Sequence, residues 1–386
     1  MELTGKTIFI ISREGWGKMF FSKHHYAVEL GKRGNKVYFI THPDQQRKLR
    51  RGEIKIIKSG YENVSIVNHR LIHPYFFIFK YNRLYNFLTK FHIKRIISKL
   101  AVTPDVIWSF EISNSLPLKH FPAKTLKIFM PVDGPYGGVE VEAAKNADVI
   151  FSVTNEILAG YSELAIPKYF INHGVAELFI NSEINTQVSR PLKAGYSGCF
   201  LTGDIDRKSL MHIIKENAHV QFNLWGEYEV GCSEIHLPDD CSDADTVAFI
   251  SFLKNSANVI LHGVANSADL AAGLKKMDVL LVGYVIEKNQ SRGTNSHKLL
   301  EYLGSGKVVV SSNMSTYSNN FPGLLQMCKS RKNNNELPLL FSDVIHNLNF
   351  YNSQKEQNVR IKFAKGFTYP NQIKKIENIL TELKNC

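Results

Sequence analysis

One stretch in the C-terminal half of the chain places a basic and an acidic side chain at the start of an expected helix. Residues 293–307 read Gly-Thr-Asn-Ser-His-Lys-Leu-Leu-Glu-Tyr-Leu-Gly-Ser-Gly-Lys. The free N–H groups of a helix start and the charge of Lys298 favour a phosphate group. Glu301 lies about one turn further on, where a carboxylate can accept hydrogen bonds from two vicinal hydroxyls, as on a ribose. The loop, the lysine and the glutamate could therefore hold a diphosphate at one end and a ribose at the other.

The elements that would position these groups are a polar loop, a short helix, a glycine stop and a buried strand. Asn295 or Ser296 is expected to cap the helix with its side chain, and the leucines that follow give the helix an apolar side. Gly304 or Gly306 can end it in the left-handed region. The β-branched run after Lys307 suits a buried parallel strand. On spacing alone, the alternative of an ordinary αβ unit with a capped helix is favoured.

The residues themselves carry a resemblance. The stretch from Asn295 to Leu303, followed by Gly306–Val310, resembles the donor-nucleotide motif of GT-B glycosyltransferases and is most similar to glycosyltransferase family 4. The resemblance implies that Glu301 binds the ribose and that the loop with Lys298 binds the diphosphate. The family pairs this glutamate with another one, eight positions earlier, that contacts the donor sugar, and here that position is Gly293. The nucleotide half of the motif is kept and the sugar half is altered.

The resemblance also implies a wider donor-nucleotide site. Basic residues at the start of the helix that begins near Arg207 reach the diphosphate in the family, and two cations can neutralise a leaving nucleotide without a metal. Asp243-Ala244-Asp245 has the letters of a metal-binding Asp-x-Asp triplet, but we interpret its polar surroundings as a loop. We therefore expect a metal-independent enzyme with no cofactor. The expected donor-binding residues are Gly198, Arg207, Lys208, Thr294, Asn295, Ser296, Lys298 and Glu301.

Three side chains of the first half are candidates for a general base. Asp133 follows an expected strand at 125–132, and the carboxyl edge of a parallel sheet is where ligands bind. The alternative is a turn-forming aspartate bonded to its own backbone, but resemblance to inverting GT-B enzymes supports the catalytic interpretation. Glu111, at the end of a strand at 105–110, is the second choice. Of the two adjacent helix histidines, His25 is the candidate, and His24 is expected to be packed.

Strands alternate with helices along the chain, which predicts α/β architecture with parallel, doubly wound sheets. A strand at 7–12, a loop, a helix at 23–33 and a strand at 36–41 form the first βαβ unit. The loop lacks the Gly-x-Gly-x-x-Gly and Walker patterns, which argues against a dinucleotide or ATP site. The order of elements resembles that of GT-B enzymes, which implies two Rossmann-like domains facing a cleft. The first loop would then face the cleft on the acceptor side, with Gly15, Trp16 and Gly17.

The expected domain division follows from the same pattern. An N-terminal acceptor-binding domain is expected at 1–177 and a nucleotide-sugar donor-binding domain at 194–365. The polar residues 178–193 are interpreted as a linker. A helix at 366–386 is expected to cross back to the first domain, as in the family.

Bulk properties bound the class of protein. A chain of 386 residues suggests two or three domains, and its composition is that of a globular protein. There is no apolar run long enough to span a bilayer and no signal-peptide pattern at the start, so a cytoplasmic protein is expected. The cysteines at 199, 232, 241, 328 and 386 show no Cys-x-x-Cys pair. Neither a disulfide framework nor a zinc site is indicated.

The net charge of +12 is concentrated in the first half of the chain. Residues 1–180 hold 25 basic and 15 acidic residues, and residues 46–100 within them hold 13 basic and 2 acidic ones. Aromatic and basic residues interleave between 71 and 100, which is typical of a helix that lies on an anionic membrane surface. The alternative is a core-packed helix with a solvated basic face.

These observations lead to one interpretation and two alternatives. We interpret the protein as a glycosyltransferase of the hexosyltransferase type that moves a sugar from a nucleotide-sugar, expected to be a UDP-sugar, to a hydroxyl acceptor. The basic, aromatic segment suggests a lipid-linked saccharide or glycolipid at the inner face of a bacterial membrane, in capsule, lipopolysaccharide or other surface polysaccharide biosynthesis. A nucleic-acid-binding protein is one alternative, although the segment has no RNA-recognition signature. A GT-B-like sugar-nucleotide epimerase, which needs no acceptor, is the other.

Overall fold

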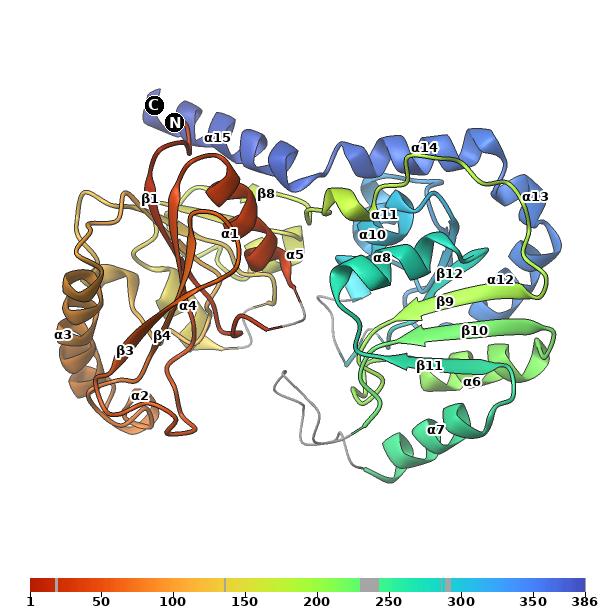
Figure 1. Cartoon of the computed structure of the whole chain (residues 1–386), viewed down its shortest axis with the longest axis horizontal. Coiled ribbons are helices and arrows are strands. Elements are labelled where there is room, and N and C mark those ends of the chain that lie inside the picture. The colour runs from red at the N-terminus through yellow and green to blue at the C-terminus, as the bar shows by residue number, and fades with distance from the viewer. Residues whose placement is uncertain (18–19, 135–136, 230–242, 286, 289–292, 386) are drawn as a thin grey trace. The chain divides into compact units, whose positions relative to one another are not determined.

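The computed structural model describes residues 1–17, 20–134, 137–229, 243–285, 287–288 and 293–385 (Figure 1). Cys232, Cys241 and Cys386 lie outside these residues, as does Pro135 after the Asp133 turn. The chain divides into two compact units: unit 1 is Met1–Asn172 with Tyr369–Cys386, and unit 2 is His173–Thr368. The first division therefore falls at residues 172 and 173, not at 177.

Unit 1 contains an 8-stranded sheet in the order β3-β4-β2-β1-β5-β6-β7-β8, in which only the β3–β4 pair is antiparallel. Its strands are β1 (Thr7–Ile11), β2 (Lys36–Ile40), β3 (Ile54–Lys58), β4 (Val64–His69), β5 (Val106–Ser109), β6 (Leu126–Phe129), β7 (Val149–Ser152) and β8 (Lys168–Phe170). Its helices are α1 (Ser22–Lys32), α2 (Phe77–Lys80), α3 (Asn82–Leu100), η1 (Leu118–His120), α4 (Gly138–Ala144), α5 (Asn155–Ala159) and α15 (Tyr369–Asn385).

Unit 2 contains a 6-stranded parallel sheet in the order β11-β10-β9-β12-β13-β14. Its strands are β9 (Leu192–Ser197), β10 (Val220–Trp225), β11 (Val259–Gly263), β12 (Val279–Val282), β13 (Val308–Ser311) and β14 (Gln326–Met327). Its helices are η2 (Glu177–Phe179), α6 (Arg207–Glu216), α7 (Ala244–Asn255), α8 (Ser267–Lys275), α10 (Lys298–Gly304), α11 (Ser315–Asn320), α12 (Leu337–His346), α13 (Leu348–Tyr351) and α14 (Gln354–Lys365). The expected α/β fold with two parallel, doubly wound sheets is confirmed.

Both faces of the unit 2 sheet are covered by helices, which explains why its central strand β12 is apolar throughout. Along β12, Val279 and Leu281 belong to a core with residues of α6, α7 and α12, whereas Leu280 and Val282 belong to a second core with residues of α8 and α10. Alternate residues of a strand point to opposite faces, so a strand buried on both faces has no polar side.

The stretch expected to be a linker lies along unit 2. Its backbone accepts hydrogen bonds from three side chains of that unit: Lys275 Nζ reaches Ile180 O, and both Lys307 Nζ and Gln357 Nε2 reach Asn185 O. Ahead of it, Val175 N donates to Phe367 O at 3.0 Å. These contacts explain why the unit begins at His173.

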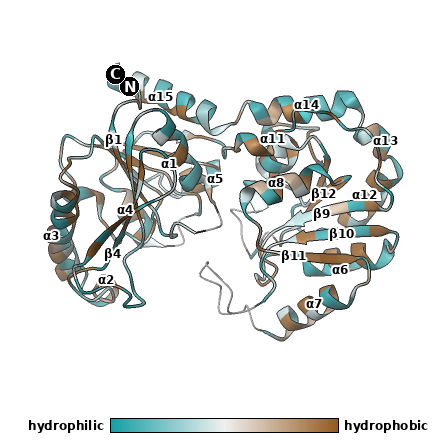
Figure 2. Cartoon of the chain, viewed as in Figure 1, coloured by the Kyte–Doolittle hydropathy of each residue, from teal (hydrophilic) through white to brown (hydrophobic). Residues whose placement is uncertain are grey.

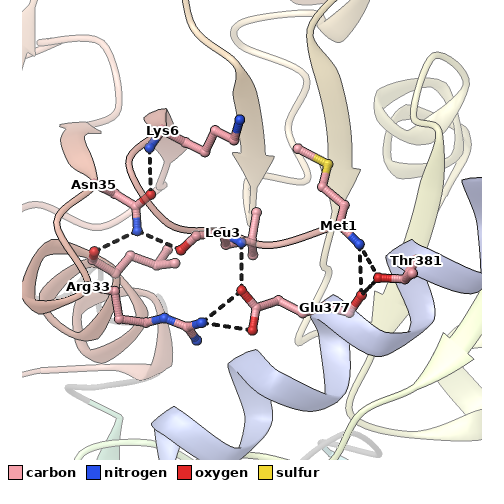
Figure 3. A network of polar contacts seen from close by, with 8 residues as sticks. Met1, Leu3, Lys6, Arg33, Asn35, Glu377 and Thr381 are labelled. Carbon is pink, nitrogen blue, oxygen red and sulfur yellow. Dashed lines mark hydrogen bonds and ion pairs between the residues drawn. The ribbon is translucent and has the colours of Figure 1, made fainter.

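The C-terminal helix α15 belongs to unit 1, and its Glu377 carboxylate binds residues near the N-terminus (Figure 3). Glu377 accepts the backbone N–H of Leu3 at 2.6 Å and two bonds from the Arg33 guanidinium, both at 2.8 Å. Asn35 joins the same network by donating to Leu3 O and accepting from Lys6 N. The network connects the N-terminal segment, the end of α1 and α15.

Candidate active site

Two glycines at the carboxyl edge of the unit 2 sheet allow neighbouring turns to meet. Gly226 follows β10 with a φ of +137°, and a Cβ there would lie 1.7 Å from Gly198 O. Gly198 follows β9 and donates its N–H to Trp225 O at 2.8 Å. A Cβ on Gly198 would lie 2.7 Å from the ammonium of Lys298. The absence of side chains at this turn therefore leaves the space that the ammonium occupies.

Aromatic rings from two strand ends surround Lys298, the first residue of α10. Its Nζ donates to Tyr284 Oη at 2.8 Å, and it lies 5.3 Å from the Tyr284 ring centroid and 5.7 Å from that of Tyr196. Tyr302, on the same helix, accepts the N–H of Ser197 at 2.7 Å, which attaches α10 to the end of β9. Within the described part of the chain, Lys298 forms no ion pair. The site therefore presents a cation that is held by rings and a hydroxyl.

The carboxyl of Glu301 is the second group of the predicted motif. Glu301 is half-buried in the first turn of α10, and its side chain makes no hydrogen bond to another described residue. Burial raises the pKa of Glu301 to about 8, against the opposing effect of the Lys298 charge. The carboxyl is therefore mostly protonated at neutral pH, so it is available both to donate and to accept hydrogen bonds.

The hydrogen bonds of the loop before α10 differ from the expected ones. Neither Asn295 nor Ser296 caps the helix with its side chain; His297 occupies the cap position, and Leu299 N bonds to Ser296 O at 3.1 Å. Asn295 O instead accepts Nε2–H of His173 at 3.3 Å, and burial lowers the pKa of that histidine to about 4. Both loop residues are buried at 3% exposure, because the loop folds back onto the start of unit 2. The other end of the helix agrees with expectation: Gly306 has a φ of +82°.

A guanidinium that the sequence did not single out lies beside the start of this loop. Arg331 follows β14 and is half-buried, with Nη1 3.4 Å from Gly293 O and Nη2 3.4 Å from Thr294 Oγ1. Asn334, in the same segment, donates to Tyr284 O at 2.9 Å. A basic residue in the loop between β14 and α12 has no local signal, so only the fold places Arg331 near the motif.

Arg207 and Lys208, the two basic residues on α6 that were predicted to bind the diphosphate, have different surroundings from each other. The Arg207 guanidinium donates to Leu201 O, Thr202 O and Thr246 Oγ1, the last at 2.8 Å, so its Nη2 serves the joint between α6 and α7. Lys208 is exposed on the first turn of α6.

The Asp-x-Asp stretch is not a loop, as we had interpreted it. Asp243 is the N-cap of α7, and its side chain accepts the N–H of Thr246 at 2.6 Å. Aspartate is a preferred N-cap residue, which explains the polar composition. Among the described residues, no group of three or more His, Cys, Asp and Glu side chains is placed to hold a metal ion.

In unit 1, the two candidate carboxylates follow the neighbouring parallel strands β5 and β6. Glu111 is buried at 3% exposure and accepts hydrogen bonds from N–H and O–H groups of both Ser113 and Ser115. Its oxygens are thus occupied in shaping the loop after β5. Asp133 follows the end of β6 and is half-buried.

The first loop of unit 1 packs aromatic rings onto the start of α1. Trp16 is half-buried, with its ring centroid 4.9 Å from that of Phe39 and 5.3 Å from that of His24. His24 is buried, as expected: its Nδ1 accepts Phe21 N–H, so its Nε2–H donates to Gly15 O at 2.9 Å. Gly15 is exposed and Gly17 half-buried. Trp16 thus forms one wall of an aromatic cluster.

His25, the histidine named as a candidate base, is also packed. The His25 ring stacks on Tyr369 of α15 with centroids 4.9 Å apart and 20° between planes. Burial lowers the pKa of His25 to about 3. A histidine with so low a pKa is a weak base at neutral pH, which argues against His25 as the general base.

Comparison with solved structures identifies the fold. The lipopolysaccharide outer core galactosyltransferase WaaB matches with a TM-score of 0.58 at 14% identity over 97% of this chain and 99% of that one. The Anabaena protein HepE, in complex with UDP and glucose, matches with a TM-score of 0.68 at 12% identity over 97% and 99%. Sucrose-phosphate synthase from Thermosynechococcus elongatus also gives 0.68 at 12% identity over 98% and 100%. No family model matches the chain, and no curated protein matches its sequence. The chain has the GT-B fold.

The pKa of Glu301 gives a prediction for stability. Because its pKa is about 8 in the folded protein and 4.5 ordinarily, the folded state keeps a proton that the unfolded chain releases between these values. The unfolding free energy of unit 2 should therefore fall as the pH rises from about 4.5 to about 8. Urea unfolding followed by tryptophan fluorescence, to which Trp225 contributes from unit 2, should show a smaller fall for Glu301→Gln than for the unmodified protein. Glu216→Gln, at an exposed position on α6, should leave the pH dependence unchanged, and equal slopes for all three proteins would contradict the prediction.

Proposed function

We propose that the protein is a glycosyltransferase that uses a nucleotide-sugar, specifically a UDP-sugar, as its donor. The observation that carries this proposal is the arrangement around α10, where Gly198 leaves room for the Lys298 ammonium and Glu301 lies one turn away. A diphosphate needs a cation without a competing carboxylate, and a ribose needs a group that binds two hydroxyls. The HepE structure holds UDP and glucose, and its fold matches 97% of this chain. The GT-B fold favours this function over the nucleic-acid-binding alternative.

In the proposed reaction, the bond between the anomeric carbon and the phosphate oxygen breaks, and a bond from that carbon to the acceptor hydroxyl oxygen forms. The electron pair of the broken bond leaves with UDP, whose charge Lys298 offsets without a metal ion. The acceptor proton goes to Asp133. The reaction is thereby a metal-independent transfer with the donor bound by unit 2 and the acceptor by unit 1.

The donor assignment is tested at Glu301. Glu301→Ala removes the group that binds the ribose, so UDP affinity should fall by roughly 10–100-fold, since each of the two hydrogen bonds to the ribose hydroxyls contributes ~0.5–1.5 kcal/mol. Titration calorimetry with UDP measures this directly. Glu216→Ala is the matched control and should bind UDP like the unmodified protein. Unchanged UDP affinity of Glu301→Ala would sink the ribose assignment.

The base assignment is tested at Asp133. Asp133→Asn keeps the shape of the side chain and removes its basicity, so turnover should fall by roughly 10²–10⁴-fold while UDP affinity stays the same. Turnover is measured as release of UDP from the donor in the presence of acceptor. Full turnover by this variant would leave Asp133 as a turn residue only. Glu111→Gln serves as the comparison, and its main effect should be on the stability of unit 1.

We further propose that the acceptor lies at an anionic membrane surface. The buried face of α3 contains Tyr85, Ile93 and Ile96, so the core-packing interpretation accounts for that side. The outer side is different: large apolar residues on α2 and α3 are exposed next to Lys80, Arg83, Lys90 and Lys94. Figure 2 shows the resulting alternation of hydrophilic and hydrophobic residues along α3. No described helix is long and apolar enough to cross a bilayer. The exposed residues are Phe76, Phe79, Tyr81, Leu84, Phe87 and Phe91.

This combination of rings and lysines suits a surface that lies on a bilayer. A lipid-linked saccharide or glycolipid at the inner face of a bacterial membrane, as used in surface polysaccharide assembly, would be within its reach.

Vesicle binding tests the membrane proposal. Changing Lys90, Lys94 and Lys99 to glutamate should abolish binding to anionic vesicles, because each basic residue near such a surface contributes about 1 kcal/mol. Co-sedimentation at low salt measures the bound fraction. The control reverses Lys374 and Lys375, which are exposed on α15, and should bind normally. Unmodified protein that does not bind anionic vesicles at low salt would end this proposal.

A further inference from the structure

The guanidinium of Arg331 lies half-buried with much of its binding capacity unused. An arginine has five N–H donors in a planar fork. Here the two donors that reach the loop do so at 3.4 Å, at the long end of hydrogen-bond distances, and within the described residues the side chain forms no ion pair. The carboxylate of Glu336, on the same segment of the chain, accepts the backbone N–H of Lys329 at 2.7 Å. A half-buried guanidinium with unused donors and no ion pair is suited to bind an anionic ligand.

The position of Arg331 corresponds to one end of the proposed donor site. A nucleoside diphosphate sugar is linear: ribose, two phosphates, then the sugar. With the ribose at Glu301 and the diphosphate at Lys298, the sugar lies beyond Lys298 on the side away from Glu301. Gly293 and Thr294, which Arg331 contacts, precede Lys298 in the chain. Tyr284 joins the two regions, because it accepts Lys298 Nζ–H at its hydroxyl and Asn334 Nδ2–H at its carbonyl.

At the sugar end of the proposed site, the side chain is a cation, whereas the hydroxyls of a neutral sugar would favour a carboxylate. Sugar hydroxyls are good donors to a carboxylate, but Gly293 supplies none. A guanidinium fork instead matches a carboxylate with two parallel hydrogen bonds. We propose that Arg331 selects a donor whose sugar carries a carboxylate, that is, a nucleotide-linked hexuronic acid. This inference rests on the proposed function, and it names the substrate class for that same site.

Donor binding tests the inference in two steps. Titration calorimetry compares UDP, UDP-glucose, UDP-galactose, UDP-glucuronate and UDP-galacturonate on the unmodified protein. At least one uronate should bind ~10–100-fold more tightly than its neutral counterpart, the effect of a charge-assisted pair. Absence of UDP binding would overturn the proposed function, whereas UDP binding without a preference for either uronate would overturn the inference alone.

Variants of Arg331 separate the carboxylate from the diphosphate as its partner. Arg331→Gln should weaken binding of the preferred uronate ~10–100-fold, which removes the preference. UDP and the neutral donors should bind within about twofold of their normal affinity. Arg331→Lys should retain an intermediate preference, because the charge is kept and the fork is lost. Lys332→Gln removes an exposed neighbouring charge and should change nothing. An equal loss for UDP, neutral donors and uronates in Arg331→Gln would assign Arg331 to the diphosphate and overturn the inference.

Discussion

The ammonium of Lys298 can occupy its place only because two turns of unit 2 lack side chains. The Gly198 and Gly226 backbones meet so closely that a Cβ on Gly226 would overlap Gly198 O at 1.7 Å. Any side chain on Gly198 would enter the space of the lysine, at 2.7 Å from its Nζ. The contact fixes the ends of β9 and β10 against each other and opens a space beside Tyr196. The position of the cation, and with it the proposed diphosphate site, depends on this backbone contact.

The parts of the fold and site that could be predicted from the sequence are the local ones. The α10–β13 unit, with Lys298 and Glu301 one turn apart, follows from hydrophobic spacing and the glycine stop, and the structure reproduces it. The contacts of Arg331 with Gly293 and of His173 with Asn295 join residues far apart in the chain, so no window of sequence contains them. The helix cap was mispredicted for the same reason, because the loop is held by tertiary contacts that override the local preference of its side chains.

The carboxylates of unit 1 show how surroundings separate residues that the sequence presents alike. Glu111 and Asp133 both follow an expected strand, and Asp133 ranks first only through the resemblance to inverting GT-B enzymes. The structure gives Glu111 hydrogen bonds from two serines, which is the environment of a carboxylate that organises a loop. A group whose oxygens are already occupied must give up these bonds before it can take a proton from a substrate. That cost argues against Glu111 as the base.

The charges of the proposed donor site suit an anionic ligand, because no carboxylate among the described residues pairs with its two cations. Within the described residues, Lys298 and Arg331 have no ion-pair partner, and Glu301 is mostly protonated at neutral pH because burial raises its pKa to about 8. Holding partly buried cations without counter-charges costs free energy of desolvation, which the folded unit has to offset elsewhere. An anionic ligand that bridges both cations recovers that cost upon binding, and it then stabilises the folded unit by mass action. A neutral sugar attached to UDP would offset the charge at Lys298 only, whereas a carboxylate-bearing sugar would offset both, so the same electrostatic argument that supports a nucleotide donor also favours a hexuronic acid on it.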